Sequence, residues 1–105
     1  MKTLRDRHRA PTHPGALLRE DVLPALRMSQ QEFARRLGVS RVTLNTLLNE
    51  RCDLSVDLAA RIAKLLRHTP QSWIRMQEAL DLWRIAKDPS RLADVKPLPR
   101  NLSAA

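Results

Sequence analysis

A single glycine between two short helical patterns constrains the fold of this chain more than any other feature. The stretch SQQEFARRLGVSRVTLNTLLNE, residues 29–50, carries apolar side chains at helical spacing on both sides of Gly38. Gly38 can take the left-handed backbone conformation that stops one helix and lets the next begin at a sharp angle. Ala34, one turn earlier, is small enough for the second helix to cross closely. The stretch therefore predicts two helices that meet at a corner, either as part of a helical core or to hold one helix out to a partner.

Helix start signals flank this corner and recur along the chain. Ser29 and Ser40 are placed to cap the two helices, and Glu32 would complete a capping box with Ser29. Pro14 suits the first turn of an earlier helix, with His13 positioned to cap it. Further patterns predict the remaining helices: one with Leu17, Leu18, Val22 and Leu26 inward that Pro24 should end or kink near Leu23, one after Asp53 or Ser55, and one from Thr69-Pro70 to about Ala86.

The pattern predicts an all-α fold of five helices in one domain. The chain has 105 residues, which is enough for a single core. Residues 1–12 predict a basic N-terminal arm, residues 13–87 the domain with its last helix at 70–86, and residues 88–105 an extended or flexible C-terminal tail. We expect no membrane span and no signal peptide, because no apolar run has the necessary length.

The charge balance favours an acidic partner. The chain holds 19 Lys and Arg against 11 Asp and Glu, a net charge of +8, and nucleic acid is the commonest acidic partner of such chains. A basic surface that serves only solubility is the alternative. The single cysteine, Cys52, excludes a disulfide within the chain and points to a reducing compartment.

The helix predicted at residues 41–49 has one side suited to base edges. Its leucines share one side, and Val42, Asn45, Thr46 and Asn49 share the other, with no acidic residue before Glu50. Arginine can pair with guanine, asparagine with adenine, and a valine or threonine methyl with thymine. For Asn45 and Asn49, plain solvation explains the pattern as well as contact does.

The corner resembles the helix-turn-helix of the phage-repressor (Cro/C1, or XRE) family. Ala34, Gly38 and five apolar positions match that family: Phe33, Leu37, Val39, Leu44 and Leu47. The resemblance implies that residues matching Ser40, Arg41, Val42, Thr43 and Thr46 touch bases or backbone and that Gln30 touches phosphate. Asn45 and Asn49 are added as candidate base contacts, and Arg51, which follows the helix, as a candidate phosphate contact. The predicted DNA-binding residues are therefore Gln30, Ser40, Arg41, Val42, Thr43, Asn45, Thr46, Asn49 and Arg51.

Two flanking segments resemble a narrower group, the HigA antitoxins of bacterial HigB–HigA modules. HPGALLRE at residues 13–20 is similar to the opening of that family, and TPQSWIRMQEALDLW at residues 69–83 is similar to its last helix. The resemblance implies a cytoplasmic bacterial protein that binds its own operator and neutralises a HigB-type ribonuclease toxin. A repressor without a toxin, or an inhibitor that does not bind DNA, are the alternatives.

The last predicted helix carries more apolar surface than one docking face needs. Tryptophan is a frequent interface anchor, so we expect a homodimer through this helix, although a small core that uses both tryptophans explains the pattern too. A two-fold dimer would place two recognition helices about 34–36 Å apart on a palindromic operator. The predicted dimer residues are Trp73, Ile74, Met76, Leu80 and Trp83.

The sequence gives no support for catalysis. His8, His13 and His68 lie far apart, and no nucleophile signature or glycine-rich phosphate loop is present. One cysteine cannot provide an ordinary zinc site. We therefore expect a protein that is not an enzyme and that needs no metal or cofactor.

Overall fold

The computed structural model describes residues 9–102, and within them all regular structure is helical. The elements are α1 (Pro14–Leu17), η1 (Leu18–Val22), α2 (Leu23–Leu26), α3 (Gln30–Leu37), α4 (Arg41–Leu48), α5 (Val56–Leu66), α6 (Pro70–Lys87), and two short 3₁₀ turns, η2 (Pro89–Leu92) and η3 (Arg100–Leu102). Because α1, η1 and α2 are continuous, the domain has five helical rods, as the sequence predicted.

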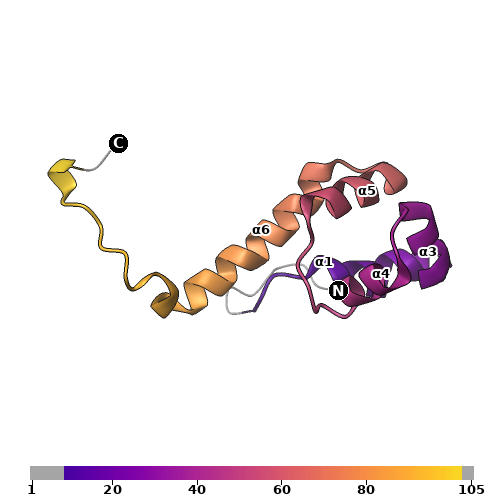
Figure 1. Ribbon diagram of the computed structural model, residues 1–105, viewed down its shortest axis with the longest axis horizontal. Helices are drawn as coiled ribbons and strands as arrows, with labels where there is room; N and C mark the ends of the chain where they lie inside the picture. Colours follow the sequence, from indigo (N-terminus) through magenta and orange to yellow (C-terminus); the bar gives the residue numbers. More distant parts are fainter. Residues whose placement is uncertain (1–8, 103–105) are drawn as a thin grey trace.

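The helices α1 to α5 gather at one end of an elongated molecule of 56 × 31 × 23 Å. The long α6 begins against α5 and then leaves the other helices, so its C-terminal half and the chain after it project away (Figure 1). Residues 88–102 are exposed along their whole length. The predicted arm, residues 1–12, lies mostly outside the described residues, but Pro11 is already buried, so the packed part begins earlier than residue 13.

The first helix does not end near Leu23, one of the two outcomes predicted for Pro24, and passes instead through a wider helical turn just before the proline. Residues 18–22 form a π-helical turn, in which the Leu23 N–H donates to the carbonyl of Leu18. This wider turn leaves room for the proline ring and accommodates its lack of a backbone N–H, so the helix continues to Leu26. The register changes with it: Leu23 is buried and Leu26 is 43% exposed, although we had predicted Leu26 inward.

Hydroxyl caps start the later helices where the sequence placed them. Ser29, Ser40, Ser55 and Thr69 each accept a hydrogen bond from the N–H three residues on, at 3.0–3.3 Å. The capping box at Ser29 is only half formed. The Glu32 carboxylate turns instead to the side chains of Arg35 and Arg36.

The corner between α3 and α4 forms as predicted. Gly38 has φ = 76°, and its N–H and that of Val39 donate to the carbonyls of Arg35 and Ala34 at 3.1 Å. Ala34 is 1% exposed beneath the crossing. The core joins all five rods and contains Leu18, Leu23, Phe33, Ala34, Leu37, Leu44, Leu47, Leu48, Leu54, Leu58, Ala59, Ile62, Ala63 and Trp73.

The start of α1 is seated directly on the end of α4. The His13 ring accepts from the Gly15 N–H at 2.9 Å through Nδ1 and donates to the Cys52 carbonyl at 3.1 Å through Nε2. A Cβ atom at Gly15 would lie 1.8 Å from the carbonyl oxygen of Leu47. The HPG sequence therefore has a packing reason: a cap, a helix-compatible proline and the one residue that permits this approach.

Gly15→Ala is expected to destabilise the fold by about 3 kcal/mol or more, because backbone rather than a flexible side chain occupies the space. The midpoint of thermal unfolding, followed by circular dichroism, measures the effect. Gln31→Ala on the exposed side of α3 is the matched control and should leave the midpoint nearly unchanged. Equal midpoints for Gly15→Ala and the native protein would contradict the seating of α1 on α4.

Candidate nucleic-acid interface

The outer side of α4 is exposed along its length because its leucines hold the opposite side in the core. Leu44 and Leu47 are 0% exposed and Leu48 is 1% exposed, whereas Val42 is 75% exposed. At the start of the helix, the Ser40 hydroxyl accepts from the Thr43 N–H at 3.0 Å and donates to the Thr43 hydroxyl at 2.9 Å. The first turn of α4 is therefore fixed while its outer side stays open.

The polar side chains of this surface form a chain of amides between α3 and α4. The Asn45 side chain donates to Gln30 at 3.2 Å, and Asn49 donates to Asn45 Oδ1 at 3.0 Å. Each amide has two N–H groups and an oxygen that accepts twice. Asn45 consequently keeps one N–H and one acceptor position for a further partner.

Apolar groups lie beside these amides. The Thr46 hydroxyl donates to the Val42 carbonyl at 2.8 Å, so Thr46 offers a methyl group rather than a free donor. Together with the exposed Val42 side chain, it supplies the apolar part of the surface. A hollow of about 320 Å³ is lined by Gln30, Arg41, Val42 and Asn45 and brings the predicted residues of α3 and α4 together.

All nine predicted DNA-binding residues lie at the surface in the structure. Gln30 and Thr46 are half-buried, and the other seven, Ser40, Arg41, Val42, Thr43, Asn45, Asn49 and Arg51, are exposed. Arg51 follows the helix, and its N–H donates to the Thr46 carbonyl at 3.0 Å. This bond and that of the Glu50 N–H to Leu47 close the end of α4 as a Schellman motif.

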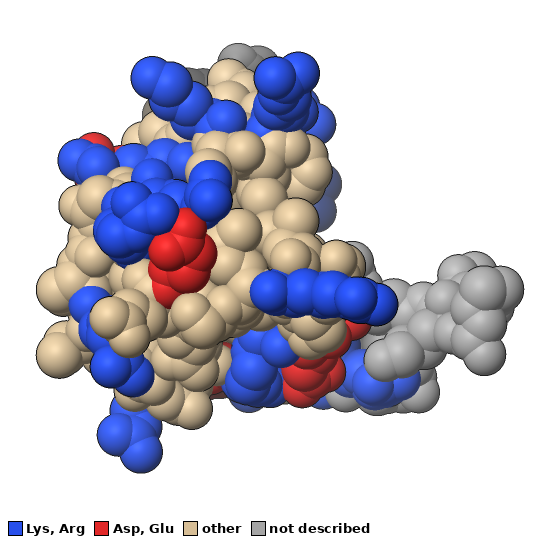
Figure 2. Space-filling model, turned by 90° about the vertical axis from the view of Figure 1, so that its right-hand side faces the viewer, with Lys and Arg blue, Asp and Glu red and all other residues tan. Residues whose placement is uncertain are grey.

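Among the charged residues at the end of the molecule that carries α3, α4 and α5, Lys and Arg outnumber Asp and Glu (Figure 2). Some of this charge is compensated locally. Arg35 and Arg36 each hydrogen-bond the Glu32 carboxylate at 2.6 Å, and they hold the pKa of Glu32 down at about 2. Among residues 9–102, Arg41 and Arg51 make no ion pair, so their charge is available to an anionic partner.

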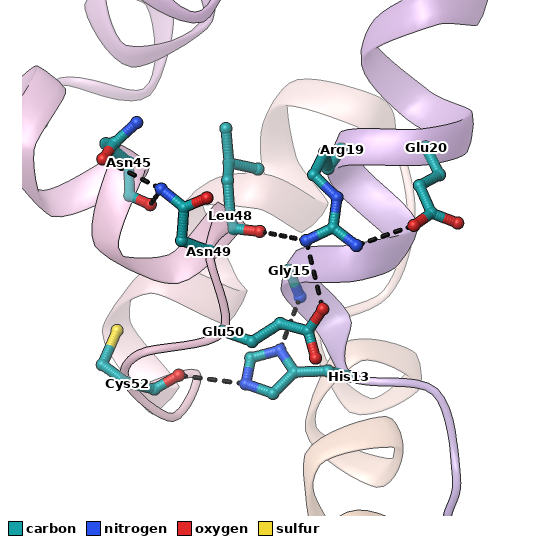
Figure 3. A network of polar contacts seen from close by, with 9 residues as sticks. All are labelled: His13, Gly15, Arg19, Glu20, Asn45, Leu48, Asn49, Glu50 and Cys52. Carbon is teal, nitrogen blue, oxygen red and sulfur yellow. Dashed lines mark hydrogen bonds and ion pairs between the residues drawn. The ribbon is translucent and has the colours of Figure 1, made fainter.

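Arg19 is a residue that the sequence analysis missed. Its guanidinium lies against the C-terminal end of α4 and donates to the Leu48 carbonyl at 2.6 Å and to Glu50 at 3.1 Å (Figure 3). Periodicity gives no signal for this contact, because the partners lie 29 and 31 residues further along the chain. Only the packing of the first helix on α4 brings them together.

The structure corrects part of the predicted dimer surface on α6. Trp73 is 2% exposed and Leu80 is 5% exposed, so both belong to the core of one chain; Trp73 also donates from Nε1 to His68 at 3.1 Å. Ile74, Met76 and Trp83 remain partly exposed, and Leu82 is 67% exposed. The buried Gln77 accepts from the Leu54 N–H at 2.8 Å and fixes α6 to the segment after α4.

The described part of the chain offers little for metal or redox chemistry. No group of three or more His, Cys, Asp or Glu residues that could hold a metal ion occurs in it. Burial and the neighbouring Asp53 raise the pKa of the Cys52 thiol, which makes it a poor nucleophile. None of the helices in residues 9–102 is apolar over a length that would cross a membrane.

Comparison with known proteins identifies relatives over most of the chain. The family profile described as helix-turn-helix matches residues 18–73. An uncharacterised HTH-type transcriptional regulator of Haemophilus influenzae is 32% identical over 92 residues, which cover 85% of this chain and 86% of the relative. Antitoxin HigA-1 of Vibrio cholerae is 31% identical over 80 residues, covering 76% of this chain and 75% of the antitoxin.

Solved structures give the same picture. Antitoxin GraA is 35% identical with a TM-score of 0.78 and covers 86% of this chain and 99% of its own. The antitoxin HigA of Pseudomonas aeruginosa, solved with the higBA promoter, is 30% identical with a TM-score of 0.74, covering 85% and 99%. By its corner, its core and these relatives, the chain belongs to the XRE-type helix-turn-helix family, and HigA antitoxins are among its relatives.

Proposed function

We propose that this protein is a sequence-specific DNA-binding antitoxin that represses its own operon as a homodimer and neutralises a HigB-type ribonuclease toxin. The observation that carries the DNA-binding part is the outer side of α4, which is exposed, uncompensated in charge at Arg41 and backed by buried leucines. Support also comes from GraA in complex with its operator, which is 34% identical with a TM-score of 0.77 and covers 92% of this chain and 99% of its own.

The chemistry of the surface fits base readout in the major groove. Arg41 offers two parallel N–H groups to guanine O6 and N7. Asn45 retains the donor and acceptor that adenine N7 and N6 require, even while it is bonded to Gln30 and Asn49. Val42 and Thr46 supply methyl groups for thymine, and Gln30, Ser40, Thr43 and Arg51 surround them for phosphate contact.

Arg41→Ala is expected to weaken binding to the operator by about 1–3 kcal/mol and to relax base preference at one position per half-site. Fluorescence anisotropy with the native and single-base-substituted operators measures both effects. Lys64→Ala on the exposed side of α5 removes the same charge and serves as the control. If Arg41 and Arg51 bring about four positive charges per dimer to the DNA, native affinity should also fall roughly 100-fold between about 50 and 200 mM salt.

A loss in Lys64→Ala equal to that in Arg41→Ala would reduce the effect to net charge and would contradict direct readout by α4. An affinity that does not change with salt would contradict phosphate binding altogether. If the protein bound no DNA but still inhibited a toxin, it would be a pure interaction protein.

The homodimer is proposed through the face of α6 that the core leaves uncovered. Met76 and Trp83 lie on this face, and a hollow of about 420 Å³ beside Met76 is lined also by Pro11, Thr12, Leu17, Ser72, Arg75 and Ala79. The Lys87 ammonium lies 5.6 Å from the centre of the Trp83 ring and makes a cation–π contact with it on this face. Ile74 and Leu82 extend the apolar surface to the other side of the helix.

Trp83→Ala is expected to weaken the dimer by about 2 kcal/mol or more, roughly 30-fold in its dissociation constant, because a tryptophan anchor is lost. Sedimentation equilibrium measures the constant. Val56→Ala, which trims an exposed apolar residue of α5, is the control and should not change it. A native protein that is monomeric at all concentrations would contradict the homodimer.

Toxin neutralisation is tested with the protein encoded beside this chain. We expect a small basic ribonuclease there that co-purifies with this protein and is inhibited by it, also when Arg41 is replaced by alanine. An operator-binding protein that inhibits no neighbouring ribonuclease would instead be a stand-alone regulator, a function that the HTH-type regulator of H. influenzae makes a second candidate.

A further inference from the structure

Arg19 joins three acceptors at the point where the first helix meets the end of α4. Its Nη1 donates to the Leu48 carbonyl at 2.6 Å and to Glu50 Oε2 at 3.1 Å, and its Nη2 donates to Glu20 Oε2 at 2.7 Å (Figure 3). The contacts to Leu48 and Glu50 link residues about 30 apart in sequence. They fix the C-terminal end of α4 to a second rod of the domain.

The end of α4 needs such support. Glu50 has φ = 59°, a left-handed conformation that is strained for a residue with a Cβ. The Leu48 carbonyl is one of the last in the helix and has no partner within α4, so a cation placed on it is favoured. Arg19 supplies that cation and also holds the side chain of the strained residue.

The charges around this point matter for a phosphate-bearing partner. Glu50 lies between Asn49 and Arg51, two residues of the candidate interface, and is the first acidic residue after the outer side of α4. A free carboxylate here would repel DNA phosphates. Paired with Arg19, its charge is offset in part, because the same guanidinium also pairs with Glu20.

We propose that Arg19 is a positioning residue for nucleic-acid binding, which acts through Leu48 and Glu50 rather than by touching DNA. The inference rests on the proposed DNA-binding function. Arg19 is not suited to contact phosphate itself, because two carboxylates, Glu20 and Glu50, already lie on its guanidinium and leave no net positive charge. Its effect is to keep the α4 terminus in place and the Glu50 charge partly compensated.

A double-mutant cycle on operator affinity tests the proposal, with Arg19→Ala, Glu50→Gln and the double variant. We expect Arg19→Ala to lose affinity about tenfold, because a charged hydrogen bond and the compensation of Glu50 are both lost. Glu50→Gln alone should change affinity less than it does in the Arg19→Ala background, since Arg19 already offsets part of the Glu50 charge. In the Arg19→Ala background the same substitution should restore part of the loss, while the Leu48 contact stays missing.

Additive effects would overturn the proposal. If Glu50→Gln raised affinity equally in both backgrounds, Arg19 would act independently of Glu50, as a direct phosphate contact would. Lys64→Ala controls for the loss of one positive charge. All affinities are measured at a temperature well below the unfolding midpoint of each variant. If Arg19→Ala does not fold, Arg19→Lys takes its place, because it keeps the charge but not the forked geometry. Arg19→Lys should lose less than tenfold in affinity but more than Lys64→Ala loses.

Amide hydrogen exchange separates this proposal from the proposed function. The N–H groups of Glu50 and Arg51 donate to Leu47 and Thr46, and we expect them to exchange faster in Arg19→Ala without any DNA present. If the native protein bound no DNA, the proposed function would fail, and the exchange would still report the contact. Unchanged exchange together with unchanged operator affinity would overturn the role of Arg19.

Discussion

The structure depends on the contact between the backbone of Gly15 and the carbonyl of Leu47. These two segments lie so close that no side chain fits between them, and His13 and Arg19 hold them together from either end. The first helix is thereby seated on the last turn of α4. Since α4 carries the candidate interface on its other side, the surface that would face DNA is positioned by a contact on the side of α4 that faces away from DNA.

The buried and exposed sides of α4 have complementary roles. Three leucines on one side exclude water and fix the rotation of the helix, while the opposite side is composed of small polar and methyl-bearing groups. Hydrogen bonds among Gln30, Asn45 and Asn49 reduce the motion of these groups without using all their donors and acceptors. A surface of this kind loses little side-chain entropy when it binds, which leaves more of the interaction energy for recognition.

Local signals carried most of what the sequence could predict. The corner at Gly38, the hydroxyl caps and the leucine side of α4 each depend on residues within one or two turns, so periodicity and cap chemistry were enough. The same reasoning could not decide whether Pro24 ends the helix or distorts it, because no local signal predicts a π-helical turn. It also grouped Trp73 and Leu80 with Met76 and Trp83, because the four residues form one stripe at spacings of three and four. This stripe crosses the edge of the core, and only tertiary packing decides which of its residues are buried. Arg19 was missed because its partners come from another helix.

Three helix ends carry a charged side chain at a positive φ angle: Arg27, Glu50 and Arg67. Glycine would adopt these conformations without strain, so the chain accepts a small loss of stability at each. The two arginines sit at helix C-termini, where the helix dipole favours cations and where they add to the positive field of the surface. Thermostability and charge are therefore opposed at Arg27 and Arg67: glycine variants there would make a more stable protein with a weaker long-range attraction for polyanions.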